Sequence, residues 1–190
     1  MTEYKRMHNF YVLTGGPAVG KTSLLEELQK RGYEVVPEIA RALIKEQQYK
    51  NADALPWKNK QLYQEIMFER SIESFQNIIR KVNTQAPIFF DRGFVDSICY
   101  SRLIRLEITE QMSNYAEHWR YNENVFILPP WQEIYETDNE RKQDWNEAVL
   151  TFEKMSETYQ NYGYNLVELP HLSVRERADF VLGFIEQDGK

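Results

Sequence analysis

The chain has 190 residues, of which 42% are hydrophobic and 27% are charged, and its net charge at pH 7 is -6. This length and composition predict a single folded domain over residues 1–190 and exclude a largely disordered chain. The acidic balance argues against a nucleic-acid surface, because phosphate backbones need a basic face. The sequence contains no apolar run long enough for a membrane helix, and its single cysteine, Cys99, suits a reducing compartment, so we expect a cytoplasmic protein.

Apolar runs and amphipathic segments alternate along the whole chain, which predicts strands and helices in alternation. Expected strands fall in residues 10–16, 33–37, 86–93, 124–130 and 164–170. Expected helices fall in residues 21–32, 39–48, 58–82 and 147–162, and in a last segment opened by the capping-box pair Ser173 and Glu176. Helical material with breaks is expected over residues 95–121. This alternation predicts an α/β fold around a five-stranded parallel sheet flanked by helices.

The stretch LTGGPAVGKTSLL matches the pattern G-x-x-x-x-G-K-[ST] of a phosphate-binding loop. The nucleotide-binding residues expected from it are Gly15, Gly16, Pro17, Ala18, Val19, Gly20, Lys21, Thr22 and Ser23. The glycines let backbone N–H groups turn inward around a phosphate at the start of the following helix. Lys21 is expected to reach the β- and γ-phosphates of ATP, and the Thr22 hydroxyl to bind Mg²⁺. A chance match is the alternative, but a strand before the loop and a helix after it argue against one.

Two acidic residues follow expected strands, at the edge where open α/β sheets bind ligands. Asp91 ends the apolar run PIFF, a Walker-B arrangement that predicts a carboxylate beside Mg²⁺; a helix N-cap or turn aspartate is the alternative. Glu38 follows VVP and is expected on the acceptor side, although a surface glutamate that opens a helix fits the same pattern. Arg92 and Asp96 flank the same loop. Arg92 is expected to bind an acceptor or a phosphate, or to pair with a neighbouring acid.

Residues 131–146 lie between the fourth and fifth expected strands and carry many charges. Small kinases with a phosphate loop have a lid at this position, where an arginine neutralises charge on the transferred phosphate. Arg141 is the residue expected in that role, with Lys142 second. A solvated loop with surface ion pairs is the alternative.

The combination of GGPAVGKTS, VVPEIAR, FFDRGFVDS, FILPPW and TDNERKQDW resembles a known family. It is similar to the small AAA-type ATPase domains related to the ribosylnicotinamide kinase part of NadR, and more broadly to deoxynucleoside and nucleoside monophosphate kinases. The resemblance covers roughly residues 10–185. It implies a P-loop kinase-like fold with strand order 2-3-1-4-5, and a nucleoside triphosphate bound with Mg²⁺.

The resemblance also implies roles for individual residues. Glu38 is similar to the acid after strand two that acts as base or substrate ligand in nucleoside kinases. Asp91 and Arg92 are similar to the acid–arginine pair after strand three of those kinases, and Arg141 to their lid arginine. Lys142 departs from the pattern, because many of these kinases have a second arginine close to the first. The resemblance names no acceptor.

Two functions remain open from the sequence. The first is an ATP-dependent kinase that phosphorylates a small nucleoside-like or other hydroxyl acceptor, which the lid-like segment and the acids after strands two and three favour. The second is a regulatory or switch ATPase that acts on a protein partner, which the AAA-type resemblance and the missing acceptor motif favour. A GTPase is disfavoured, because Asn59-Lys60 lacks the aspartate that reads guanine. We favour the kinase.

Overall fold

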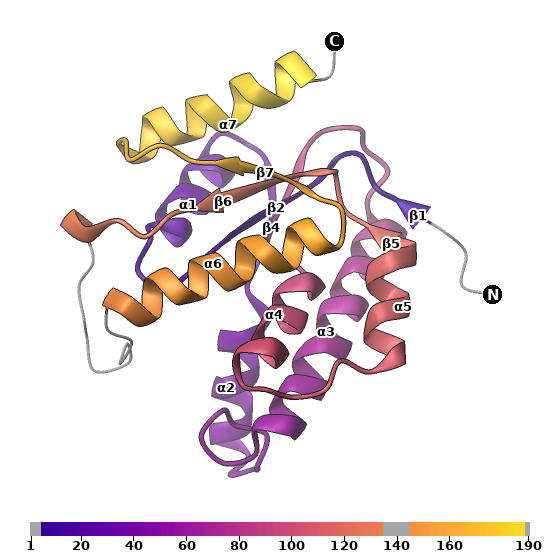
Figure 1. The fold of residues 1–190 in the computed structure, drawn as a ribbon. Helices are drawn as coiled ribbons and strands as arrows, with labels where there is room; N and C mark the ends of the chain where they lie inside the picture. The colour runs from indigo at the N-terminus through magenta and orange to yellow at the C-terminus, as the bar shows by residue number, and fades with distance from the viewer. Residues whose placement is uncertain (1–4, 135–144, 189–190) are drawn as a thin grey trace.

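A five-stranded parallel sheet forms the centre of the computed structural model, which describes residues 5–134 and 145–188 (Figure 1). Its strands are β2 (Phe10–Gly15), β3 (Glu34–Val36), β4 (Ile88–Asp91), β6 (Asn124–Leu128) and β7 (Asn165–Glu168). They lie in the order β3-β4-β2-β6-β7, which reads 2-3-1-4-5 when only the strands of this sheet are counted along the chain. The expected α/β fold with a five-stranded parallel sheet is confirmed.

Helices cover both faces of this sheet, as Figure 1 shows. They are α1 (Lys21–Lys30), α2 (Ile39–Tyr49), α3 (Lys60–Lys81), α4 (Phe94–Leu103), α5 (Glu110–His118), α6 (Trp145–Asn161) and α7 (Val174–Asp188), with a short 3-10 helix η1 (Gln132–Ile134). Alternate residues of β2 divide between two cores, because successive side chains of a strand point to opposite faces. Phe10 and Val12 pack with residues of α3, α4 and α5, and Tyr11 and Leu13 pack with residues of α1 and α7.

The region between β4 and β6 is helical with a break, as expected for residues 95–121, except that its last residues are extended. It holds two helices, α4 and α5, separated by a break in which Arg105 has a left-handed backbone with φ of 59°. The side chain of Thr109 then caps the first turn of α5 by accepting a hydrogen bond from its backbone, at 3.2 Å. The break is therefore set by local turn and cap geometry.

A second, two-stranded sheet was not expected from the sequence. The strands β1 (Lys5–Arg6) and β5 (Trp119–Arg120) pair in parallel. The N–H of Met7 also donates to the carbonyl of Arg120, at 2.8 Å. Residues 119–120 are thus extended because they pair with a segment more than a hundred residues away, a contact that helical periodicity does not encode.

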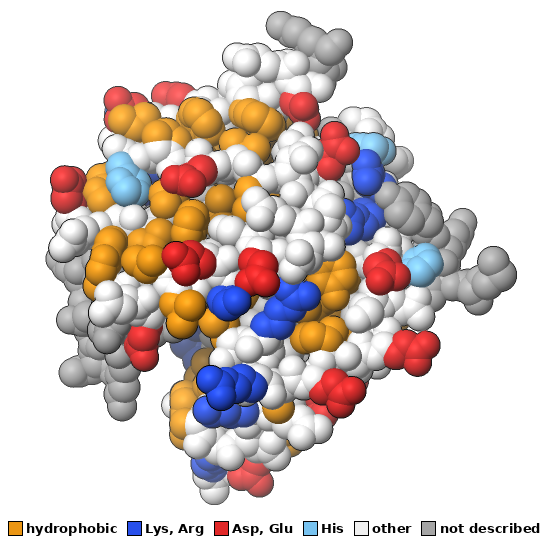
Figure 2. All heavy atoms as spheres, viewed as in Figure 1, with side chains coloured by type: hydrophobic (Ala, Val, Ile, Leu, Met, Phe, Trp, Pro, Cys, Tyr) orange, Lys and Arg blue, Asp and Glu red, His pale blue; other side chains and the backbone are white. Residues whose placement is uncertain are grey.

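The surface on the side viewed in Figure 1 has acidic and basic side chains interspersed rather than separated by sign, as the space-filling view in Figure 2 shows for the described residues. Hydrophobic side chains gather over α6 and α7 in this view. Leu150 of α6 and Phe180 of α7 are among the exposed large hydrophobic residues of the protein. Among the described helices, none combines the length and the apolar character that crossing a membrane requires.

The parallel arrangement brings the carboxyl ends of β2, β3 and β4 to one edge of the sheet. Leu13 of β2 is level with Asp91 of β4, and Val36 of β3 is level with Phe90. The segments that follow these strands therefore begin side by side. They are the glycine-rich loop after β2, the turn that contains Glu38, and the turn that contains Arg92.

The turn after β4 is supported by a fully buried aromatic side chain. The ring of Tyr121 packs against Phe75 and Phe94, with both centroid distances 4.8 Å, and it leaves no room beside Gly93. A Cβ atom at Gly93 would lie 2.8 Å from Cε2 of Tyr121. Because the surrounding rings hold Tyr121 in place, glycine is required here by close approach rather than by backbone angle.

We expect Gly93→Ala to destabilise the protein by about 1–3 kcal/mol, because the added methyl group overpacks an aromatic core that cannot move aside. Urea unfolding measures this difference in the free energy of unfolding. Gly183→Ala is the matched control, since a Cβ atom at Gly183 in α7 meets nothing within 4 Å. It should be neutral or stabilise by up to about 1 kcal/mol. Equal stability of the Gly93 variant and the wild type would contradict the packing argument.

Candidate functional site

The glycine-rich loop after β2 has the backbone shape of an anion-binding site. Ala18 and Gly20 adopt left-handed conformations, with φ of 59° and 76°. Gly20 is the N-cap of α1 and, having no side chain, makes no capping hydrogen bond to the first turn. The N–H groups of that turn keep their hydrogen-bonding capacity, and the helix dipole places partial positive charge at the same point. This end of α1 is therefore suited to a phosphate.

A cavity of about 290 Å³ lies against the loop. It is lined by residues 16–23 together with Glu38, Arg41 and Arg92. Lys21, Arg41 and Arg92 thus bring three cationic side chains to one cavity in a chain whose net charge is -6. Local positive charge of this kind attracts polyanions such as polyphosphates, even though the whole protein is acidic.

Lys21 and Asp91 form an ion pair beside this cavity, and their side chains are only 8% and 11% exposed. Burial lowers the pKa of Lys21, and the charge of Arg92 lowers it further, while Asp91 and Glu38 oppose the shift without cancelling it. Asp91 is the last residue of β4, whereas the N-cap of α4 is Gly93. The N-cap explanation for Asp91 is therefore wrong, and its carboxylate lies next to the loop lysine.

Glu38 points into the site although it occupies the N-cap position of α2. Its side chain makes no capping hydrogen bond and is 21% exposed. Nε of Arg92 donates to Oε1 of Glu38 at 3.0 Å, while Oε2 lies 3.9 Å from Nε of Arg41. Burial alone would raise the pKa of Glu38, but the charges of Arg92 and Lys21 outweigh it and hold the pKa below its usual value. Glu38 is thus an ionised carboxylate at neutral pH.

Arg92 connects Glu38 to a second buried carboxylate. Its Nη1 donates to Oδ1 of Asp96 at 3.3 Å. Burial opposes the charged form of Arg92, but Asp96 and Glu38 raise its pKa above the ordinary value, so the guanidinium stays charged. The backbone of Arg92 is left-handed, with φ of 70°. A non-glycine residue in this region costs roughly 1–3 kcal/mol, and the two carboxylates supply interactions that offset that cost.

Asp96 joins several elements below the site. Its carboxylate accepts hydrogen bonds from the Thr14 hydroxyl, from the Tyr159 hydroxyl at 2.6 Å and from the N–H of Gly93 at 2.7 Å, besides Arg92. The contact to Gly93 follows from an acid at the third position of a helix, which the sequence displays. The contacts to Thr14 in β2 and Tyr159 in α6 carry no sequence signal.

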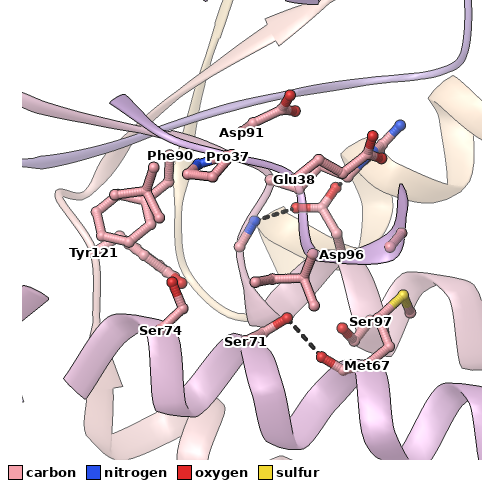
Figure 3. A pocket seen from close by; sticks show the side chains of 15 residues that line it. Pro37, Glu38, Met67, Ser71, Ser74, Phe90, Asp91, Asp96, Ser97 and Tyr121 are labelled. Atoms are coloured by element: carbon pink, nitrogen blue, oxygen red, sulfur yellow. Dashed lines mark hydrogen bonds and ion pairs between the residues drawn. The ribbon is translucent and has the colours of Figure 1, made fainter. Parts of the chain in front are cut away.

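A second, smaller cavity adjoins the site, and Figure 3 shows the side chains that line it. Its walls are the turn after β3, the turn after β4 and the face of α3 with Met67, Ser71 and Ser74. In Figure 3 the side chain of Asp91 is directed away from α3. Glu38 and Arg92 line both this cavity and the one at the glycine-rich loop. These two side chains therefore stand between the two spaces.

The structure thus brings Lys21, Glu38, Asp91 and Arg92 together, as their positions after neighbouring strands predicted. Arg141 and Lys142 lie outside the described residues, so their expected role stays a prediction. Of the expected lid over residues 131–146, the structure describes residues 131–134, which include η1, and the start of α6, which begins at Trp145 rather than at the expected residue 147.

Two arginines at the site were not assigned a role from the sequence. Arg41 follows Glu38 by three residues, a spacing that places both on one side of a helix and could have identified it. Arg177, in α7, donates to the loop carbonyl of Val19 at 3.1 Å. Nothing in the sequence distinguishes it from the exposed Arg175 of the same helix.

The residues needed for Mg²⁺ are also present. The Thr22 hydroxyl and the Asp91 carboxylate are oxygen donors, the kind that Mg²⁺ prefers. Among the described residues, no group of three or more His, Cys, Asp or Glu side chains is arranged to hold a metal ion by itself. A site with one or two protein ligands fits Mg²⁺ that takes its remaining ligands from phosphates and water.

Comparison with known proteins identifies the class to which this fold and this loop belong. A profile of the AAA domain family matches residues 10–177, and the chain therefore belongs to that family. It is a P-loop NTPase domain whose structural neighbours include kinases. A search of curated proteins found no match.

Three solved structures illustrate the shared fold. NadR in complex with NR aligns with a TM-score of 0.67 at 15% identity, covering 94% of this chain and 51% of that one, so this chain spans about half of NadR. Thymidylate kinase from Candida albicans aligns with a TM-score of 0.62 at 13% identity, covering 95% and 92%. Deoxyadenosine kinase from M. mycoides with bound dATP aligns with a TM-score of 0.59 at 14% identity, covering 94% and 100%. At these identities the likeness shows the fold.

The ion pair between Glu38 and Arg92 makes a testable contribution to stability. Because the pKa of Glu38 lies below the ordinary value of 4.5, its ionised form is the stabilising one. That contribution is complete above about pH 4.5 and is lost as the pH falls through the lower folded-state pKa. We therefore expect the melting temperature of Glu38→Gln to lie below that of the wild type at neutral pH, with the gap closing below about pH 4.5.

Melting curves of both proteins between neutral pH and about pH 3 check this expectation. Glu34→Gln is the control, because Glu34 lies on the same segment with an exposed side chain and no ion pair among the described residues. Its difference from the wild type should be small at every pH. A gap for the Glu38 variant that is constant with pH would contradict the assigned ion pair.

Proposed function

We propose that the protein is a Mg²⁺-dependent phosphotransferase that transfers the γ-phosphate of ATP to a hydroxyl group of a small nucleoside-like or other acceptor. The observation that carries the proposal is the position of Glu38 and Arg92 between the loop cavity and the smaller cavity beside α3. A kinase needs this arrangement, with phosphate on one side of a carboxylate and an acceptor on the other.

The loop residues 15–23 bind the triphosphate in this proposal, with Lys21 on the β- and γ-phosphates and Thr22 and Asp91 holding Mg²⁺. The ion pair between Lys21 and Asp91 supports these roles. Bound phosphate would give Lys21 an anionic partner in place of Asp91, and Mg²⁺ would give Asp91 a cationic partner in place of Lys21. Bound Mg²⁺ neutralises charge that develops on the phosphates. Arg92 and Arg41 add positive charge at the cavity wall.

Glu38 is the group that receives the acceptor hydroxyl in this proposal. Its Oε1 atom is held by Arg92 at 3.0 Å, which fixes the orientation of the carboxylate. Among the described residues, Oε2 accepts no hydrogen bond within 3.5 Å, since the nearest cation, Nε of Arg41, is 3.9 Å away. An ionised oxygen with this freedom can accept the hydroxyl proton or orient the hydroxyl toward phosphate.

The volume of the smaller cavity sets a condition on the acceptor. The cavity measures about 30 Å³. That is room for about one or two water molecules. A nucleoside-sized acceptor therefore requires α2 or the side chains of α3 to move outward. Water already fits, and this observation favours ATP hydrolysis as the second candidate function. The experiments below separate the two.

We expect Lys21→Ala to lose nearly all ATP turnover while keeping a cooperative unfolding transition. The substitution removes the cation that contacts the transferred phosphate, and groups of this kind contribute about 10²-fold or more to catalysis. Titration with ATP and Mg²⁺ and a turnover assay measure the effect. Lys30→Ala, at the exposed end of the same helix, is the control and should match the wild type. Unchanged affinity and turnover in the Lys21 variant would refute the site.

The choice between kinase and hydrolase is tested by screening hydroxyl acceptors for stimulation of ATP consumption. With an acceptor that stimulates the wild type, Glu38→Gln should keep ATP binding and lower transfer by about 10²- to 10⁴-fold, because the proton-accepting charge is lost. Asp91→Asn should instead weaken Mg²⁺-dependent ATP binding and lower every activity together. Chelation of Mg²⁺ should abolish turnover in the wild type.

The control for the Glu38 variant is again Glu34→Gln, which should transfer phosphate at the wild-type rate. Two results would overturn the kinase assignment and favour the hydrolase. One is that no acceptor raises ATP consumption across the screen. The other is that Glu38→Gln leaves both the basal and the stimulated rates unchanged.

A further inference from the structure

Arg177 reaches the phosphate loop from the far end of the chain. It lies in the first turn of α7, where its side chain is buried, with 4% exposed. Its Nη1 donates a hydrogen bond to the backbone carbonyl of Val19 at 3.1 Å, across 158 positions of sequence. Within residues 5–134 and 145–188, its Nε has no hydrogen-bond partner. The guanidinium therefore makes its directed contact with the loop backbone rather than with a side chain.

Arg177 also lies beside Gly20, where it fills the space that a side chain would occupy. A Cβ atom at Gly20 would lie 2.8 Å from Nη2 and 3.0 Å from Nη1 of Arg177. The guanidinium thus packs against the backbone of the loop at the residue that opens α1. On another side it lies 5.6 Å from the ring centroid of Trp131, within the range of a cation–π contact. The side chain is consequently held in one position.

The geometry of a peptide unit gives this hydrogen bond a consequence for the cavity. The C=O and N–H of one trans peptide point in opposite directions. Arg177 holds the carbonyl of Val19 outward, and the N–H of Gly20 belongs to the same peptide unit. That N–H is therefore turned away from Arg177, and Gly20 is one of the residues that line the phosphate cavity. Anchoring the carbonyl fixes an anion-binding donor.

The charge of Arg177 has no internal counter-ion among the described residues, in which no carboxylate pairs with it. Lys21 and Arg92, by contrast, contact Asp91, Glu38 or Asp96. Burial lowers the pKa of Arg177, but a guanidinium remains protonated in proteins. A buried cation without a partner is costly to stability, and a bound polyphosphate near the loop would supply the missing negative charge.

We propose that Arg177 is a positioning residue of the phosphate site, which orients the Val19–Gly20 peptide for phosphate binding and stabilises the bound phosphates with its positive charge. The proposal rests on the nucleotide binding of the proposed function but not on which acceptor receives the phosphate. Its ligand class is the polyphosphate part of a nucleotide, so inorganic tripolyphosphate is a sufficient probe.

The experiment measures the dissociation constants of MgATP and of tripolyphosphate by calorimetry, well below the melting temperature of each protein. Arg177→Met removes both the donor and the charge and should weaken both ligands by roughly tenfold or more, the effect of one hydrogen bond to a charged group. Arg177→Lys keeps the charge and should recover part of the loss. Arg177→Gln keeps a donor without the charge, and its affinity should lie between that of the methionine variant and that of the wild type.

Arg175→Gln is the matched control, because Arg175 is an exposed arginine in the same turn of α7 and its removal changes the net charge equally. It should bind both ligands with wild-type affinity. Melting temperatures of all variants separate a loss of binding from a loss of folding. If Arg177→Met does not fold, the comparison of Arg177→Lys with Arg177→Gln carries the test.

Three outcomes would overturn the proposal. The first is wild-type affinity for both ligands in a folded Arg177→Met or Arg177→Gln protein. The second is an equal loss in Arg175→Gln, which would show a general charge effect. The third is that the wild-type protein binds neither ligand. This outcome refutes the nucleotide site itself, and the measurement on the wild type is enough to show it. The first two leave the proposed function intact.

Discussion

Arg92 is the residue on which the arrangement of the site depends, because its partly buried guanidinium lies between Glu38 and Asp96. A buried charge is tolerated when it is paired and hydrogen-bonded, and each of these carboxylates comes from a different segment of the chain. The ion pairs therefore fix the turn after β3 relative to the turn after β4 and the first turn of α4. The left-handed backbone of Arg92, with φ of 70°, is maintained by the same contacts.

Asp96 extends this constraint into the core. Through Thr14 and Tyr159, its carboxylate connects β2 and α6 to the same guanidinium. Each oxygen of Asp96 accepts two hydrogen bonds, Oδ1 from Thr14 and Arg92 and Oδ2 from Gly93 and Tyr159, so the loss of one partner leaves that buried oxygen with a single donor. The side chains at the site are thus held by buried, satisfied interactions, and preorganised groups of this kind stabilise developing charge without reorganising.

The charges around the phosphate loop are arranged as pairs that a ligand can rearrange. Lys21 contacts Asp91, and Arg92 contacts Glu38, so the cavity holds cations whose partners are carboxylates. A triphosphate with Mg²⁺ brings charges of both signs and can satisfy these side chains in turn. Arg177 differs because no carboxylate among the described residues pairs with it. Its positive charge is therefore available to a bound phosphate without first breaking an ion pair to a carboxylate of the described residues.

The sequence by itself determined the α/β fold, the phosphate loop and the placement of Glu38, Asp91 and Arg92 at one edge of the sheet. Each of these follows from local pattern, because apolar runs mark parallel strands and the residues after such strands meet at their carboxyl ends. Tertiary structure alone decided which side chains complete the site. Asp96 accepts hydrogen bonds from Thr14 and Tyr159, which lie 82 and 63 positions away in the sequence. Val19 accepts one from Arg177, 158 positions away. Such contacts depend on how helices pack on the sheet, and no periodicity or motif within one segment encodes that packing.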